Sequence, residues 1–430
     1  MGSRRVAQLT SMNSQPSEHL QAPGRLVAIV CAAQVLVQIG AYFWPALLPG
    51  LTERWALTYT EAGWITAVFY GSYMVSVPIL VPLTDRIDPR RIYLFGVGLT
   101  IAGHLYFGFA ADGFWSAIVG RALAGIGWAG TYMTGLKLLA DRVDERMMSR
   151  AVTAHAAGIG IAGALSFATG DLIAHFAGWQ SAFFAAGASA AVAWTMVSIA
   201  VPRRRAAPTP LVDGGTVFDF RPVLRNRSAM AYALAYCVHT LEMNALRGWA
   251  VAFLVYVAAS TGTTDTMMAP TLVATCFALL GTAASVSGNE AAIRFGRRRL
   301  IHVAMVGSVL IAAALALAGT ASYAAAVILL TVYGAVVWLD SSSLTAGAAG
   351  TAEPSRRGAT LAVHSTLGYA GGFVGPLAVG WILDLSGGMS TVAWAAAFLM
   401  IALLTLIALT VFWLMQPREL KGDRGTMADA

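Results

Sequence analysis

The residues of this sequence that are best placed to do chemistry are ionisable side chains inside long apolar stretches. One such stretch reads His239-Thr-Leu-Glu242-Met-Asn-Ala-Leu-Arg247, and two others contain Arg121 and Asp340. An unpaired charge is costly to bury in apolar surroundings, so these residues are candidates for function. His239 and Glu242 are three residues apart and share one face of a helix, where they could share a proton. We predict that Glu242 carries a coupling proton, with His239 as its partner and Asp340 as a competing carrier.

The two arginines predict the charge of a bound solute. The planar guanidinium of Arg121 or Arg247 matches a carboxylate in geometry and charge, which favours an anionic or zwitterionic solute. If Glu242 and Asp340 neutralise both arginines instead, the site would suit a neutral or cationic molecule. A polar cluster that only joins helices is the structural alternative.

Polar and aromatic residues accompany these charges. Gln34, Gln38 and Tyr42 are spaced by four residues and so lie on one face of a helix. Each such stripe alone is more typical of helix packing than of a ligand site. Together they support a polar cavity, with helix packing as the open alternative. Besides the two arginines, the residues that we predict to bind the solute are Gln34, Gln38, Tyr42, Trp128, Tyr132, Tyr333 and Trp338.

The elements that must position these residues are membrane helices. Of the 430 residues, 57% are hydrophobic and only 11% are charged, against about 25% charged in a soluble domain. Apolar stretches of about 20 residues, long enough to cross a bilayer, recur along the chain. The net charge of +7 comes from basic residues between these stretches, so nucleic-acid binding is not expected. The three cysteines lie inside apolar runs and predict neither a disulfide framework nor a metal site.

Twelve membrane spans are predicted, six on either side of a polar break. The break at 202–228 is interpreted as a cytoplasmic linker between an N-terminal bundle (26–201) and a C-terminal bundle (229–415). Residues 1–25 are interpreted as a disordered tail and 416–430 as a second tail. The predicted spans are 26–48, 62–82, 92–111, 114–139, 150–172, 178–201, 229–259, 267–288, 300–319, 322–346, 359–383 and 390–415.

The distribution of arginine predicts the orientation in the membrane. With the amino terminus in the cytoplasm, the outer loops contain a single arginine, Arg54, and the inner loops contain many. Cytoplasmic loops carry an excess of positive charge, so both termini are predicted to be cytoplasmic, in a bacterial inner membrane. Asp171 and Asp384 then fall at outer helix ends, where we expect them to be solvated.

The loops after the second and eighth spans repeat one pattern. The first reads Asp85-Arg86-Ile-Asp-Pro-Arg90-Arg91, and the second, 208 residues later, has Ile293 in place of the acid. Here the chain resembles the major facilitator superfamily, whose corresponding loop is G-x-x-x-D-R-x-G-x-R-R. Two further similarities are Arg121-x-x-x-Gly125-x-Gly127 and the pair Gly178-Trp179, and a third is Gly375-Pro376 in a glycine-rich span.

The resemblance implies an all-α integral membrane fold of twelve helices. These form two six-helix halves, each made of 3+3 inverted repeats, with a solute site between the halves near the bilayer midplane. It also implies that Asp85, Arg86, Arg90 and Arg91 are gate residues that close the cytoplasmic side, and that Arg121 belongs to a proton-relay region. The alternative is that these loop charges only satisfy the positive-inside rule.

These observations predict a proton-coupled secondary transporter for a small organic solute, working by alternating access. No phosphate-binding G-x-x-x-x-G-K-[ST] loop and no H-E-x-x-H or G-x-S-x-G motif occurs, so neither ATP-driven transport nor an enzyme is expected. The expected partners are the solute, protons and the lipid bilayer, with a monomeric chain and no cofactor. A proton-antiport drug or metabolite exporter is the first alternative. A non-transporting membrane sensor with a transporter fold is the second.

Overall fold

The computed structural model describes residues 23–84, 86–143, 145–203, 220–263, 268–420 and 423, and within these ranges it is helical with no strand. The first bundle comprises α1 (Pro23–Gln38), α2 (Phe43–Arg54), α3 (Tyr59–Leu83), α4 (Pro89–Ala110), α5 (Phe114–Ala140), α6 (Glu145–Ala177) and α7 (Trp179–Ala200). A short α8 (Arg221–Arg225) precedes the second bundle. This comprises α9 (Arg227–Ser260), α10 (Pro270–Phe295), α11 (Arg297–Ala318), α12 (Tyr323–Trp338), α13 (Ser341–Thr351), α14 (Arg357–Leu385) and α15 (Thr391–Met415).

The helices account for the twelve predicted spans. Eleven stretches in the described ranges are long and apolar enough to cross a membrane, with α1 and α2 forming one of them and α12 and α13 another. The twelfth helix is α5, which is 27 residues long and packs along α3 and α4. The fold is therefore the predicted all-α membrane fold in two six-helix halves.

Two of the predicted continuous spans are broken near their middle. The span predicted at 26–48 is interrupted by a turn at 39–42, between α1 and α2. A Cβ on Gly40 would lie 2.6 Å from Ala186 Cβ and 2.7 Å from the His104 ring, so the turn requires glycine at this close approach. The span predicted at 322–346 is interrupted at Leu339 and Asp340, between α12 and α13. Each break lies in a helix that carries candidate site residues.

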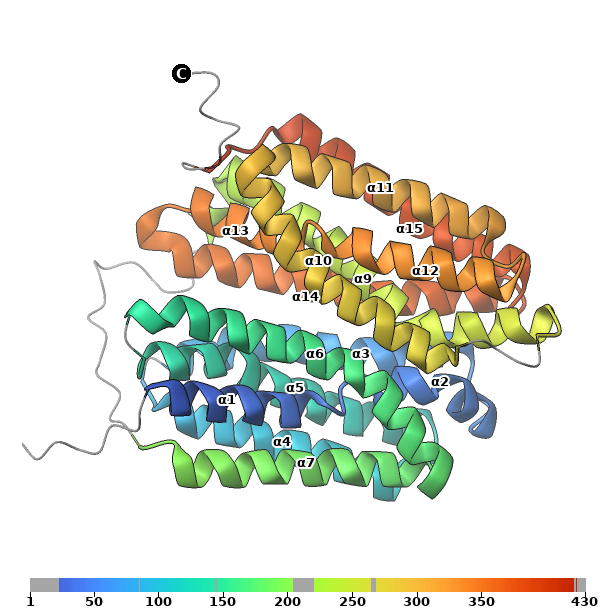
Figure 1. Ribbon diagram of the computed structural model, residues 1–430, viewed down its shortest axis with the longest axis horizontal. Helices are drawn as coiled ribbons and strands as arrows, with labels where there is room; N and C mark the ends of the chain where they lie inside the picture. The colour runs from blue at the N-terminus through green and yellow to red at the C-terminus, as the bar shows by residue number, and fades with distance from the viewer. Residues whose placement is uncertain are drawn as a thin grey trace, which may run out of the picture.

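The two bundles meet mainly through three pairs of helices. These pairs are α3 with α14, α6 with α10, and α2 with α9 (Figure 1). The start of α1 and the end of α15 lie at the same end of the molecule, which we call the terminal end (Figure 1). We call the other end of the molecule the opposite end.

Several hydrogen bonds join described residues of the two bundles between the middle of the helices and the opposite end. They are the bonds of Asp384 with Tyr59 and Thr60, of Asp171 with Thr271, and of Arg247 with Tyr42. A further side-chain hydrogen bond joins Tyr73 of α3 and Tyr369 of α14 near the middle of these helices.

Candidate functional site

Glu242 lies inside the second bundle and is held by hydroxyl groups. The Tyr333 hydroxyl of α12 donates a short hydrogen bond to Glu242 Oε1, and Thr405 Oγ1 of α15 donates to Oε2 at 3.4 Å. The side chain is 3% exposed. Two predicted site residues, Glu242 and Tyr333, are thus in direct contact. Thr405 was missed, because a single threonine in an apolar helix carries no distinguishing signal.

The partner of His239 is Asp340 rather than Glu242. His239 Nδ1 lies 2.9 Å from Asp340 Oδ1, an ion pair when the imidazole is protonated. Asp340 stands at the break between α12 and α13, where the interrupted helix turns its carboxylate toward α9. His239 also stacks on Tyr236, and Tyr236 stacks in turn on His364. The two acids therefore occupy neighbouring but separate settings, one with hydroxyl partners and one with imidazole.

Arg247 joins the two bundles. Its Nη1 donates to the Tyr42 hydroxyl of the first bundle at 2.8 Å, and its guanidinium lies 4.4 Å from the centre of the Trp338 ring. It is also 5.0 Å from the Tyr42 ring centre. Both aromatic residues were predicted to bind the solute, and both contact the cation directly. In the described part of the chain the Arg247 Nε atom has no hydrogen-bond partner, although it is buried.

Arg121 is held by backbone oxygens of the first bundle. Its Nη1 donates to the Ala41 carbonyl at 3.0 Å, and its Nε donates to the Ile65 carbonyl at 3.4 Å. Ala41 belongs to the break between α1 and α2, so the interrupted helix supplies the acceptor. The guanidinium also lies 4.4 Å from the centre of the Phe69 ring. Carbonyls and ring faces stabilise a cation but do not neutralise it.

Neither buried arginine is paired with an acid among the described residues. Arg121 is 2% exposed and Arg247 is 7% exposed, yet the ion pairs of the described chain include neither. The sequence left open whether Glu242 and Asp340 neutralise the two arginines. In this structure both acids have other partners, so two positive charges remain at the junction of the bundles.

The remaining predicted binding residues line the first bundle. Gln34 accepts a hydrogen bond from Tyr93 at 3.2 Å, and its amide nitrogen is buried without a partner in the described ranges. Gln38, one turn further along α1, is 3% exposed. Tyr132 stacks between two rings, those of Trp128 and His155.

Trp128 belongs to an aromatic group that spans both bundles. Its ring lies 4.9 Å from Tyr73 and 5.4 Å from Tyr369 of α14, measured between ring centres. Tyr73 and Tyr369 lie 3.8 Å apart and close this group across the junction. Tyr369 was missed because it stands alone in a glycine-rich segment, where glycines dominate the pattern.

The predicted gate residues differ in their exposure and contacts. Asp85 lies outside the described residues, and Arg86 and Arg91 are exposed. Arg90 is buried and donates to the Ser198 carbonyl of α7 at 2.6 Å. Asp88 caps α4 and forms a buried ion pair with Arg142 at 2.8 Å. The described part of this loop therefore ties helices of the first bundle together, and its gate role stays a prediction.

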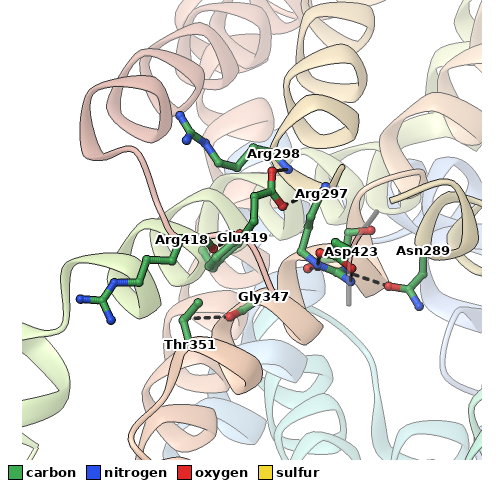
Figure 2. Close-up of polar contacts among 10 residues, drawn as sticks. Asn289, Arg297, Arg298, Gly347, Thr351, Arg418, Glu419 and Asp423 are labelled. Carbon is green, nitrogen blue, oxygen red and sulfur yellow. Dashed lines mark hydrogen bonds and ion pairs between the residues drawn. The ribbon is translucent and has the colours of Figure 1, made fainter. Parts of the chain in front are cut away.

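The second copy of the loop is bound by the segment that follows α15 (Figure 2). The Glu419 carboxylate accepts hydrogen bonds from the backbone N–H groups of Arg297 and Arg298, at the start of α11. The Arg297 guanidinium pairs with Asp423 at 3.1 Å and donates to Asn289 Oδ1 at 3.0 Å. Ile293 stands where the first loop has an acid, and the segment after α15 supplies two carboxylates to this loop, those of Glu419 and Asp423.

Comparison with known proteins identifies the family. The model of the Major Facilitator Superfamily matches residues 30–260 and 243–428. The chain is 24% identical to the uncharacterised MFS-type transporter YbcL of Bacillus subtilis (strain 168), over 49% of this chain and 55% of that protein. It is 26% identical to the human protein spinster homolog 1, over 54% of this chain and 46% of that protein. The aligned region thus spans about half the length of each relative.

The fold has a close counterpart among solved structures. A mutant form of the nucleoside transporter NupG superposes with a TM-score of 0.75 and 12% sequence identity, covering 91% of this chain and 99% of that one. Two bundles joined at a polar junction, a matching family model over most of the chain and this superposition lead to one conclusion. The protein belongs to the Major Facilitator Superfamily of membrane transporters.

Proposed function

We propose that this protein is a proton-coupled secondary transporter of a small anionic organic solute, working by alternating access. The observation that carries the proposal is the separation of charges at the junction of the bundles. Two buried arginines have no acid partner among the described residues, while two buried acids nearby have hydroxyl and imidazole partners. The arginines are available to a solute anion, and the acids are available to protons.

Arg247 is the residue best suited to bind the solute anion. Its contacts come from both bundles, because Tyr42 lies on the first and Trp338 on the second. A carboxylate or phosphate on the solute would give the guanidinium a charged acceptor, and such hydrogen bonds are roughly twice as strong as neutral ones. Binding of the solute anion to Arg247 would therefore change contacts in both halves of the transporter.

Glu242 and Asp340 are the proposed proton carriers. Glu242 is five residues from Arg247 on α9, so its protonation removes one negative charge close to the guanidinium that is proposed to bind the solute anion. The hydroxyls of Tyr333 and Thr405 can stabilise the ionised form, whereas burial favours the neutral form. His239 Nδ1 lies 2.9 Å from Asp340 Oδ1, a distance at which the two groups can share a proton. Protonation and solute binding would be coupled through this shared electrostatic environment.

The proposed setting is a bacterial inner membrane with both termini in the cytoplasm. The terminal end of the molecule would then face the cytoplasm. The bundles are hydrogen-bonded to each other near the opposite end, which supports assignment of this conformation to the inward-facing state. The name of the nucleoside transporter that shares the fold is consistent with a small organic solute, and the solute itself is open.

The test is transport by purified protein in proteoliposomes. A panel of monocarboxylates, dicarboxylates, organic phosphates and uncharged nucleosides is first screened for thermal stabilisation of the protein. The stabilising compounds are then assayed as radiolabelled solutes, with a pH gradient imposed in either direction. Uptake driven by an acidic exterior indicates symport, and export driven by the same gradient indicates the antiport alternative. Stabilisation only by uncharged compounds would contradict the anionic solute.

The role of Arg247 predicts the effect of one substitution. Arg247→Gln should weaken binding of the stabilising anion by roughly tenfold to a hundredfold, because a hydrogen bond to a charged group contributes about 1.5–3 kcal/mol. Arg54→Gln is the matched control, since Arg54 is exposed at the end of α2. Equal affinities for the two variants in a binding titration would show that Arg247 is structural.

A further inference from the structure

The start of α3 is completed by a residue of the other bundle. The first N–H groups of a helix have no partner within the helix and need acceptors from elsewhere. A capping box between Thr58 and Glu61 satisfies two of them: Thr58 Oγ1 accepts from the Glu61 N–H, and the Glu61 carboxylate accepts from the Thr58 N–H. The N–H groups of Tyr59 and Thr60 remain.

Asp384, near the end of α14, accepts both remaining hydrogen bonds. Tyr59 N–H donates to Asp384 Oδ1 at 3.0 Å, and Thr60 N–H donates to Oδ2 at 2.7 Å. The carboxylate also sits at the positive end of the α3 dipole. A Cβ on Gly380, one turn earlier, would lie 2.2 Å from the Tyr59 carbonyl, so the two backbones are in close contact here. Asp384 was expected to be solvated, and instead it caps a helix of the opposite bundle.

A second acid makes a related contact on the other side of the junction. Asp171 lies in the last third of α6, and its Oδ2 accepts a hydrogen bond from Thr271 Oγ1 at 2.8 Å, in the first turn of α10. In each case an acid of the fifth helix of one half meets the first turn of the second helix of the other half. Asp384 accepts from backbone N–H groups, and Asp171 accepts from a side-chain hydroxyl, so the two contacts use corresponding helices with different donors.

We propose that Asp384, with Asp171 as its counterpart in the other half, is a latch that holds the opposite end closed and releases when that end opens. The chemistry suits a reversible contact, because the freed N–H groups and carboxylate would both be taken up by water. The inference rests on the proposed alternating access but not on the identity of the solute or on proton coupling.

The test measures the conformational equilibrium without any solute. Spin labels are attached to a pair of cysteines at the opposite end, Ala110→Cys and Ala321→Cys, in a background lacking the native cysteines. A second pair at the terminal end is Ala140→Cys and Gly358→Cys; all four positions are exposed. Distances are measured by pulsed electron paramagnetic resonance in nanodiscs.

Asp384→Ala should raise the ratio of open to closed molecules at the opposite end by about tenfold, as expected for the loss of a carboxylate at a partly buried helix N-terminus. The distance between the labels at the opposite end should lengthen and that at the terminal end should shorten. Glu61→Ala is the matched control, because it removes a cap of the same helix that stays within one bundle. It should leave both distributions as in the parent protein.

A second pair of variants removes the partner side of the latch. Tyr59→Pro deletes one donated N–H, and proline is compatible with the first helical position after the extended Thr58. Tyr59→Ala removes the same ring but keeps the N–H. The proline variant should be more open at the opposite end than the alanine variant. Unchanged distributions in Asp384→Ala, or identical ones in the two Tyr59 variants, would overturn the latch whatever the transport assay shows.

Discussion

At the scale of the residue, the acids and the cations of the junction form separate sets. Glu242 and Arg247 are five residues apart on α9, yet they share no partner among the described residues. Asp340 pairs with His239. A site in which every charge was already matched would gain little from binding an ion. Separate sets instead allow a proton and a solute anion to bind at once, each to its own group.

This separation predicts that Glu242→Gln uncouples the transporter. The substitution preserves the shape of the side chain and removes its titration, while Arg247 remains in place. We expect proton-driven accumulation of the solute to be lost, and exchange of unlabelled for labelled solute across the membrane to be retained. The measurement is radiolabel accumulation and counterflow in proteoliposomes over a range of pH.

Two companion variants make the result specific. Thr405→Val removes a hydrogen-bond donor to Glu242 without removing the carboxyl group, so accumulation should persist with a shifted pH profile. Asp340→Asn tests the competing carrier under the same conditions. If Glu242→Gln still concentrates solute with an unchanged pH profile while Asp340→Asn does not, the coupling proton belongs to Asp340.

The sequence identifies these charged residues but does not show which of them are in contact. A charge inside an apolar stretch is visible without any structure, and so Glu242, Arg247, Arg121 and Asp340 were all identified. Helical spacing, however, reports only which residues share a face of one helix. The contact of His239 with Asp340 depends on how α9 meets the break before α13, and that is decided by packing between helices. For the same reason the sequence could not predict that Asp384 reaches α3.

At the scale of the element, the positions of the spans follow from local hydropathy, but their breaks do not. A stretch of about 20 apolar residues must be helical in a membrane, because its backbone hydrogen bonds have no other partner. The break at 39–42 depends on the approach of Gly40 to Ala186 and His104, which are distant in the sequence. Each break frees backbone groups beside a site residue, as the Ala41 carbonyl bound by Arg121 illustrates.

The tail after α15 acts as part of the second bundle. Glu419 caps α11, and Asp423 reaches the buried guanidinium of Arg297, which also donates to the Ser343 carbonyl of α13 (Figure 2). The tail therefore binds the start of α11 at the terminal end, where Arg297 also joins α11 to α13. The sequence interpretation treated this segment only as a tail, because its acids show no pattern until the chain folds back.

Asp423→Ala should destabilise the protein more than a surface substitution does. Removing one partner of a buried ion pair leaves an uncompensated charge, at a cost of about 3–5 kcal/mol. We expect the melting temperature in detergent to fall by several degrees. Glu290→Ala is the matched control: its pair with Arg294 is exposed, and such pairs contribute about 0–1 kcal/mol. Equal melting temperatures for the two variants would show that the tail contact contributes no stability.

At the scale of the whole molecule, the two ends differ in both charge and contact. Asp384 and Asp171 join described residues of the two bundles near the opposite end, where Arg54 is the only arginine of the predicted outer loops. The terminal end carries the repeated arginine loops and the bound tail. The twelve-helix architecture was predictable because hydropathy, duplication and family resemblance agree. The conformation was not, because contacts between the bundles depend on packing between helices that are distant in the sequence.

The charge difference predicts the orientation, which can be measured directly. Arginine is retained on the cytoplasmic side during membrane insertion, so the terminal end should face the cytoplasm. In a background without Cys31, Cys237 and Cys276, single cysteines at Glu53 or Ser260 should react in intact cells with an impermeant thiol reagent. Both positions are exposed at the opposite end.

Single cysteines at Ala140 or Gly358, which are exposed at the terminal end, should react only after the cells are opened. The Asp384→Ala substitution provides an internal check, because it alters the conformation but cannot alter the orientation. Labelling at Glu53 and Ser260 should therefore stay external in that variant. Labelling of Ala140 and Gly358 from outside intact cells would reverse the orientation, and the latch at Asp384 would then close the cytoplasmic side instead of the outer one.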